Sequence, residues 1–263
     1  MGVKVAKMSG RGLGHTGGTI DKLESIDGFK VSLSNEEFLN QVNNVGCAVI
    51  SQTKNIVPAD KKIYALRDVT GTTESIPLIA SSIMSKKIAS GADVIIIDVK
   101  VGNGALMKTV DNATKLANLM IKIGKSYNKK VVCLLSNMEE PLGKNIGNGL
   151  EVIEALQTLK GEGPSDLTNL VLALGSLMVS NALNITEEEA KIKLIENIKN
   201  GKAYNKFREM VKAQGGNIDK IIIEENVVSI KSSKDGFVKS IKTEELGNIA
   251  RRIKAGRLNK DDQ

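Results

Sequence analysis

The stretch from residue 93 to residue 136 constrains the fold more than any other part of the chain. It begins and ends with β-branched apolar runs, at 93–99 and 130–136, of the kind found in strands buried within a sheet. Between them, the segment 107–125 has apolar residues at helical spacing: Leu116, Leu119, Met120 and Ile123. A strand, a helix and a strand in this order predict a right-handed crossover and therefore a parallel pair of strands.

The chain up to residue 213 shows the same alternation. A third buried strand is predicted at 45–51, and helices are predicted at 75–90, 152–159 and 167–182. Thr186 begins a capping-box sequence that predicts one more, amphipathic helix. We therefore predict an α/β fold with a central, mostly parallel sheet flanked by helices over residues 1–213.

A second unit is predicted from residue 214 onward, where the sequence Gln-Gly-Gly-Asn marks a boundary. The runs 221–224, 227–230 and 236–241 alternate apolar residues with lysines, a pattern typical of strands with one wet face. Residues 214–263 are therefore expected to form the start of a β-rich C-terminal domain that stops before it is complete.

A glycine-rich segment near the N-terminus is the first candidate site. Five glycines lie between Gly10 and Gly18, interleaved with an arginine, a histidine and a threonine. Glycines allow a ligand to approach bare backbone N–H groups, and neighbouring hydroxyls and cations suit an anionic oxygen, most often phosphate. His15, the only histidine, is either an acid or base or a structural residue bonded to the backbone.

The second candidate site combines Arg67 with the following helix. Ser82 and Lys86 are four residues apart and therefore share one helix face. An arginine fork, a hydroxyl and a lysine suit a flat heterocycle with carbonyl oxygens that gains negative charge as it leaves. On spacing alone, a solvated helix face is the simpler interpretation.

The third candidate site follows the predicted strand 93–99. Asp98 and Lys100 stand there with two glycines, at the carboxyl end of a parallel strand, where α/β proteins bind ligands. The two charges can pair with each other or line the cleft, and the sequence leaves both alternatives open.

Composition excludes several function classes. The 263 residues carry a net charge of +7 without a basic block, and 3% aromatics with no Trp, so nucleic-acid binding is not expected. Cys47 and Cys133 lie in apolar runs, and no signal peptide or apolar stretch of membrane-spanning length is evident, which predicts a cytoplasmic protein with no membrane partner. The sequence has no Ser–His–Asp set, HExxH motif or Walker lysine, which argues against a hydrolase, a zinc enzyme and a P-loop kinase.

Three motifs together carry a resemblance to a known family. They are the segments KMSGRGLGHTGGTIDKLE at 7–24, YALRDVTGT with SSIMSKK at 64–72 and 81–87, and PLGKNIGN at 141–148. In this order they resemble the thymidine and pyrimidine-nucleoside phosphorylases, and the likeness runs from about Val3 to the last residues. The resemblance implies phosphorolysis of a pyrimidine nucleoside, such as uridine, thymidine or deoxyuridine, to the free base and (deoxy)ribose 1-phosphate.

The resemblance also implies residue roles. Phosphate would be held by Lys7, Met8, Ser9 and Thr19, and the pyrimidine by the catalytic residues Arg67, Ser82 and Lys86. The Leu142 and Asn145 carbonyls and the Glu154 side chain would provide part of a site for a monovalent cation, potassium, and the family's upstream segment supplies the remaining ligands. No organic cofactor is implied, and members of the family are homodimers with a small helical domain.

The resemblance leaves alternatives open. The family has a further glycine-rich loop and most of its small helical domain upstream, so we expect the chain to lack the N-terminal segment and the end of the C-terminal domain. The alternatives are a thymidine-specific phosphorylase or a catalytically inactive fragment of such an enzyme, and anthranilate-type phosphoribosyltransferases are a more distant one.

Overall fold

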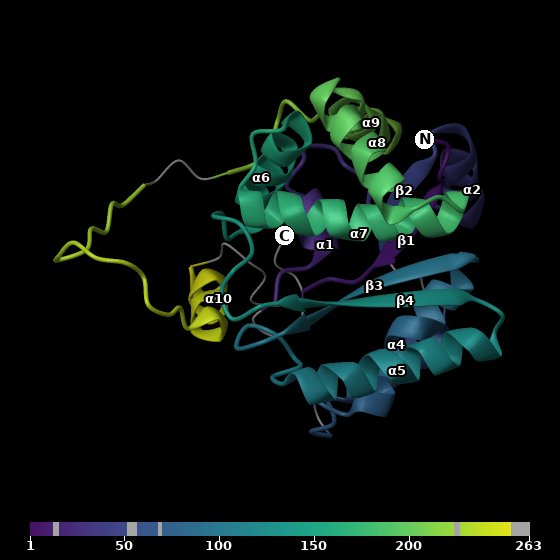
Figure 1. Cartoon of the computed structure of the whole chain (residues 1–263), viewed down its shortest axis with the longest axis horizontal. Coiled ribbons are helices and arrows are strands. Elements are labelled where there is room, and N and C mark those ends of the chain that lie inside the picture. Colours follow the sequence, from purple (N-terminus) through teal and green to yellow (C-terminus); the bar gives the residue numbers. More distant parts are fainter. Residues whose placement is uncertain (13–15, 52–56, 68–69, 224–226, 254–263) are drawn as a thin grey trace.

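The strands of the described chain form two parallel pairs (Figure 1). The structure is a computed structural model that describes residues 1–263 except 13–15, 52–56, 68–69, 224–226 and 254–263. Strand β1 (Val5–Ser9) pairs with β2 (Cys47–Ser51) from Val5 opposite Cys47 to Ser9 opposite Ser51. Strand β3 (Val94–Val101) pairs with β4 (Lys130–Asn137) from Val94 opposite Lys130 to Val101 opposite Asn137.

Helices occupy much of the remaining chain. Their bounds are α1 (Thr19–Leu23), α2 (Asn35–Asn44), α3 (Pro58–Arg67), α4 (Ile76–Ala89), α5 (Val110–Ser126), α6 (Asn148–Lys160), α7 (Ser165–Leu183), α8 (Glu187–Lys199), α9 (Lys202–Ala213) and α10 (Thr243–Arg252).

The β3–β4 pair lies between helices. Figure 1 shows α4 and α5 on one side of it and α7 on the other. Apolar residues at helical spacing on α5 meet the inward face of β3, and Met84, Ile95 and Met120 lie in the resulting core. This packing holds the carboxyl end of β3 at a fixed position beside the other segments of the site.

The β1–β2 pair is covered by α2, whose Phe38 and Val42 pack with Ile50 of β2. Helices α1, α6 and α9 share a neighbouring core. Gln214 is buried where these parts meet, and its amide donates to the carbonyls of Lys30 and Val49 at 2.8 and 2.9 Å.

The predicted α/β class with parallel strands is confirmed, with two corrections to the sheet. The described strands form two pairs rather than one continuous sheet. Strand β4 was predicted to be buried, but none of its residues is fully buried, whereas alternate residues of β3 are. Strand β1 was not predicted, since five residues with a central lysine give only a weak strand pattern.

The three strands predicted at 221–224, 227–230 and 236–241 are not formed in the described residues. Ile221 makes one isolated bridge to Ile26, the Ile222 N–H donates to the Ser25 carbonyl at 2.8 Å, and residues 227–242 belong to no strand. Val228 and Phe237 are almost fully exposed, and the next element is the helix α10. An alternating pattern needs a neighbouring strand to become a sheet, and this segment has none among the described residues.

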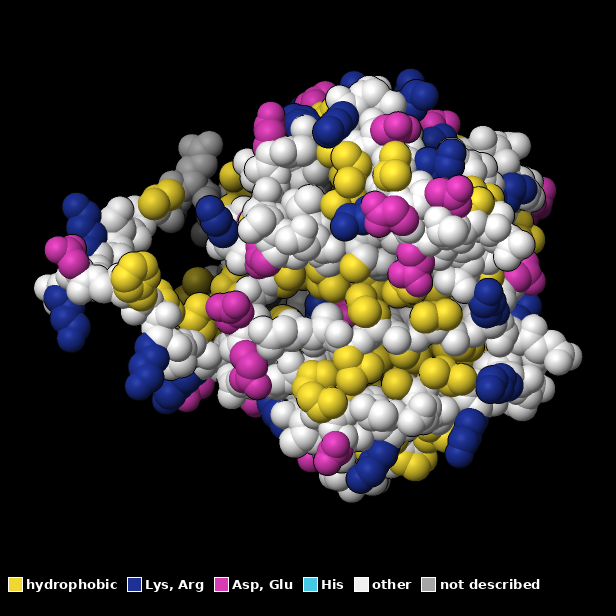
Figure 2. All heavy atoms as spheres, viewed as in Figure 1, with side chains coloured by type: hydrophobic (Ala, Val, Ile, Leu, Met, Phe, Trp, Pro, Cys, Tyr) yellow, Lys and Arg dark blue, Asp and Glu magenta, His cyan; other side chains and the backbone are white. Residues whose placement is uncertain are grey.

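Helix α7 corrects a further expectation. It has 19 residues, and an 18-residue window of it has a mean hydropathy of 1.3, so the helix is long and apolar enough to cross a membrane by length and composition. One such helix is weak evidence for a membrane span, because core helices of soluble proteins share these properties. Figure 2 shows hydrophobic side chains gathered in a band across the middle of this face of the molecule.

Candidate functional site

Arg67, Ser82 and Lys86 lie close to one another around the ring of Tyr64. The Lys86 ammonium Nζ is 2.8 Å from Ser82 Oγ and 5.9 Å from the Tyr64 ring centroid, and Arg67 Cζ is 5.6 Å from that centroid. Arg67 and Ser82 are buried and Lys86 is largely buried, so this is not the solvated helix face that spacing alone suggested. The structure therefore brings together all three residues predicted to hold the pyrimidine.

Helix α3 supplies two residues of this group that sequence reasoning missed. Asp60 Oδ2 lies 2.5 Å from Lys86 Nζ, and burial raises the pKa of the Tyr64 phenol. Asp60, Tyr64 and Arg67 follow the spacing i, i+4, i+7 and so share one helix face, a signal that could have identified them. We call Asp60, Tyr64, Arg67, Ser82 and Lys86 the Tyr64 cluster.

The turn after α3 fixes the Arg67 guanidinium. Its Nε donates to the Thr72 carbonyl at 3.3 Å, and its Nη2 donates to the Thr73 carbonyl. A guanidinium has five N–H donors, and Nη1 makes no hydrogen bond to a described residue. The side chain is thus held in place with donors left for a ligand.

Lys7, Met8 and Ser9 occupy the end of β1, where alternate side chains point to opposite faces. The Met8 side chain is buried in the core and can offer a ligand only its backbone. Lys7 stays open to solvent, yet its pKa is lowered, first by burial and then by the nearby Lys22. The Lys7 amine is therefore reached by water but largely surrounded by protein, and we call this position at the end of β1 the recess.

Lys87 connects this strand end to the helix of the Tyr64 cluster. It follows Lys86 on α4, and its Nζ donates to the Met8 carbonyl at 3.2 Å. Burial, followed by the charges of Lys7 and Lys86, lowers the pKa of Lys87 to about 8. Sequence reasoning gave Lys87 no role, because a second lysine beside Lys86 resembles a surface residue.

The glycine-rich segment folds back onto carboxylates of α1 and its C-terminus. The Gly12 N–H donates to Asp21 Oδ2 at 2.7 Å, and Arg11 pairs with Asp21 and Glu24. A Cβ on Gly18 would collide with the backbone of Gly12, so these glycines permit close packing. His15 lies outside the described residues.

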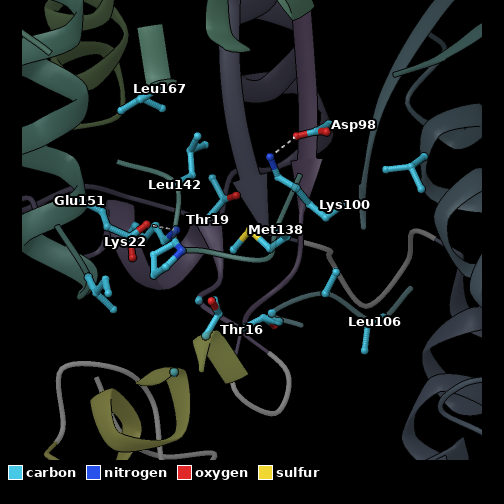
Figure 3. A pocket seen from close by; sticks show the side chains of 18 of the residues that line it. Thr16, Thr19, Lys22, Asp98, Lys100, Leu106, Met138, Leu142, Glu151 and Leu167 are labelled. Carbon is cyan, nitrogen blue, oxygen red and sulfur yellow. Dashed lines mark ion pairs between the residues drawn. The ribbon is translucent and has the colours of Figure 1, made fainter. Parts of the chain in front are cut away.

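A cavity of about 690 Å³ opens beside this segment (Figure 3). Thr16, Thr19 and Lys22 line it on one side, and its other lining residues include parts of β3, the loop around 138–146, α4, α5, α6 and α10. Lys22 forms an ion pair with Glu151 within it. Thr19 is thus the one predicted phosphate residue that lines the cavity, and the Tyr64 cluster lies outside its lining.

Asp98 and Lys100 form an ion pair and also line this cavity (Figure 3). Both alternatives left open by the sequence, pairing with each other and lining the cleft, are therefore true. Lys100 Nζ lies 2.9 Å from Asp98 Oδ2, and Ser136 Oγ of β4 donates to Asp98 Oδ1 at 2.5 Å. Although the two charges are close, Lys100 Nζ is buried without a well-directed hydrogen bond. The pair lies at the carboxyl end of β3, the position predicted from the sequence.

Leu142, Asn145 and Glu154 also line the cavity. Glu154 is buried, and its Oε1 accepts a hydrogen bond from the Lys144 N–H at 2.9 Å. A Cβ on Gly143 would collide with the Glu154 carboxylate, so the loop lies directly against this side chain. Two carbonyls and one carboxylate are hard oxygen donors that fit a cation of low charge.

These features define an α/β domain with a cationic recess at a strand end and a buried polar cluster suited to a flat ring. The sequence matches the glycosyl transferase family, a/b domain, over residues 1–204, and the chain belongs to this family.

Three relatives named pyrimidine-nucleoside phosphorylase are similar to the chain. The protein of Staphylococcus epidermidis strain ATCC 12228 is 54% identical over 269 residues, that of Staphylococcus haemolyticus is 52% identical over 271, and that of Staphylococcus aureus strain RF122 is 53% identical over 269. These matches cover 99–100% of this chain and 62% of each relative. The chain therefore spans less than two thirds of the length of these relatives.

Proposed function

We propose that this chain carries the pyrimidine- and phosphate-binding residues of a pyrimidine-nucleoside phosphorylase. The observation that carries the proposal is the Tyr64 cluster. In it Arg67 and Lys86 lie beside one aromatic ring, and Lys86 Nζ donates a hydrogen bond to Ser82 Oγ. The names of the relatives support the same activity.

The chemistry follows from what each group can do. A phosphate oxygen forms a bond to the anomeric carbon of the sugar while the bond from that carbon to the pyrimidine nitrogen breaks, and the base departs with the bonding electrons. Arg67 and Lys86 place positive charge where the pyrimidine oxygens gain negative charge. The Ser82 hydroxyl donates or accepts a hydrogen bond at the edge of the pyrimidine ring. Because the turn holds Arg67 in place, its guanidinium needs little rearrangement when the substrate binds.

Potassium belongs to this proposal as the monovalent cation. Leu142, Asn145 and Glu154 would provide part of its site at the loop around Gly143, where the carboxylate supplies the charge and the two carbonyls supply further oxygen donors. The bound cation would neutralise a buried carboxylate and stiffen the loop that lines the cavity. The homodimer and the cytoplasmic location also remain proposals, and sedimentation of the purified chain tests the first.

Adjacent serines on α4 provide a matched test. Ser82 is buried beside Lys86, whereas Ser81 is exposed. We expect calorimetry to show uracil binding to wild type and Ser81→Ala, and binding at least tenfold weaker to Ser82→Ala. Equal affinity in all three proteins, or no uracil binding to wild type, would contradict the assignment.

Turnover is measured separately, as base release from uridine and from thymidine with phosphate. Release from both supports the proposed substrate range, and thymidine-only release would indicate the thymidine-specific enzyme. A chain that binds uracil and phosphate without turnover would be the inactive form.

A further inference from the structure

Lys7, Lys22, Lys86 and Lys87 lie near one another where the end of β1 meets α4, and within the described residues two of them have carboxylate partners. Lys22 of α1 pairs with Glu151, and Lys86 of α4 pairs with Asp60. Lys7 and Lys87 have no carboxylate partner among the described residues. This part of the recess therefore carries two cations that the described protein does not neutralise.

The uncompensated pair is costly for the folded chain. Among the described residues, the Lys87 ammonium has one hydrogen bond, to the uncharged Met8 carbonyl, and the Lys7 ammonium has none. Burial and then the charge of Lys22 lower the pKa of Lys7, and burial followed by the charges of Lys7 and Lys86 lowers that of Lys87, because lost hydration and nearby like charges both disfavour an ammonium. An anion between them would remove the repulsion and replace the hydration that both amines have lost.

The recess is open to such an anion. Lys7 is exposed to solvent. Lys87 is half-buried, and its ammonium is bonded to the carbonyl of Met8, the residue that follows Lys7 on β1. Lys7 and Lys87 come from a strand and a helix that are both held by the core, so their separation is fixed before the ligand arrives. A preformed pair of cations favours a compact dianion over a single carboxylate.

We infer that Lys87 binds the phosphate dianion together with Lys7, as a second cationic phosphate ligand on the helix that carries Lys86. The identity of the anion rests on the proposed function. Because Lys86 and Lys87 are adjacent on α4, phosphate on one and pyrimidine on the other would hold both substrates against a single helix. Phosphate binding would therefore restrict α4 and strengthen binding at the Tyr64 cluster.

The charged groups around Lys87 determine how the affinity for the anion depends on pH. Lys7 faces it from β1 and Lys86 is its neighbour on α4, while Asp60 of α3 neutralises Lys86 and Glu151 of α6 neutralises Lys22. Below its pKa of about 8, Lys87 is protonated and attracts the anion. Above that pH the charge is lost, so anion affinity falls as pH rises.

Calorimetry with inorganic phosphate and with sulfate tests the inference on the full chain without nucleoside. Sulfate keeps its two charges across the range, so its pH dependence reports groups of the protein. At pH 7 we expect Lys87→Met to bind either anion about tenfold more weakly than wild type, the loss expected for one charged hydrogen bond. Lys4→Met, which removes an exposed lysine whose Nζ donates to Asn43 Oδ1, should bind as wild type does.

Lys87→Arg provides a second variant that keeps the charge. Between pH 8 and pH 9.5, sulfate affinity should fall more steeply in wild type than in Lys87→Arg, because arginine stays protonated. This comparison tests the role of Lys87 in anion binding even if Lys87→Met fails to fold. Parallel pH profiles of wild type and Lys87→Arg would overturn the inference.

The failures of this inference and of the proposed function are distinguishable. Equal phosphate affinity in wild type and Lys87→Met, or no anion binding to wild type, overturns the role of Lys87. Uracil binding at the Tyr64 cluster is measured in the absence of phosphate and tests the proposed function on its own.

Discussion

The ammonium of Lys86 lies 2.5 Å from Asp60 Oδ2, so one ion pair ties α4 to α3 at the Tyr64 cluster. The Asp60 side chain is 9% exposed and that of Lys86 is 18% exposed, so water screens the pair only weakly. Helices α3 and α4 share few other contacts, and this pair fixes the position of the lysine that we assign to the pyrimidine.

The first prediction concerns this pair. Asp60→Asn should lower the free energy of unfolding by about 2 kcal/mol, because it leaves a largely buried ammonium without its carboxylate. Asp93→Asn is the control, since Asp93 is 98% exposed and lies 3.5 Å from Lys129 Nζ. Urea denaturation checks both variants, and an equal loss in the two would contradict a special role for the Asp60–Lys86 pair.

The second prediction concerns the proposed cation site. Gly143→Ala places a methyl group against the Glu154 carboxylate, whereas Gly91→Ala has open space at a similar φ of +78° against +75°. Both changes should cost about 1 kcal/mol of backbone strain. Potassium should raise the thermal midpoint of wild type and Gly91→Ala but not of Gly143→Ala, and sodium and lithium series provide the comparison. A potassium effect that survives in Gly143→Ala would exclude this site.

The third prediction concerns Gln214, which is buried where the β1–β2 pair meets the core of α1, α6 and α9. Gln214→Leu should lower the free energy of unfolding by about 2 kcal/mol, because the buried side chain would no longer donate to the carbonyls of Lys30 and Val49. Gln157→Leu makes the same change at an exposed position of α6 and should have little effect. Thermal and urea unfolding measure the difference, and two equally stable variants would refute it.

The fourth prediction concerns the pH dependence of the loop that holds Gly143. Asp166 accepts a hydrogen bond from the Gly143 N–H at 2.8 Å, which lowers its pKa below the ordinary value of 3.8. A carboxyl with a lowered pKa stabilises the fold above its unfolded pKa, and this stabilisation is lost as pH falls through the folded value.

Comparison with Asp166→Asn isolates this contribution. Wild type should be the more stable protein at pH 7, and its advantage should shrink below pH 3.8 in acid-dependent urea unfolding. An advantage that stays constant down to the acid-unfolding limit would contradict the prediction.

Local patterns predicted the elements that depend on nearby residues. The capping box at Thr186 is confirmed, with Glu189 N–H donating to Thr186 Oγ1 at 3.2 Å and Thr186 N–H donating to Glu189 Oε2 at 2.9 Å. The strand–helix–strand unit from β3 to β4 is likewise confirmed. The strands expected beyond residue 220 are not formed in the part of that segment that the structure describes, because a strand forms only where another strand satisfies its backbone hydrogen bonds.

The sequence by itself determined the α/β class, the start of α8 and the shared helix face of Ser82 and Lys86. These features depend on periodicity and capping, which act over a few residues of chain. Only the tertiary structure decided which charges meet: Asp60 reaches Lys86 across 26 residues, and Lys87 reaches the Met8 carbonyl across 79. Charge pairing depends on how distant elements pack, and packing left Lys7 and Lys87 without a carboxylate partner in the described part of the chain.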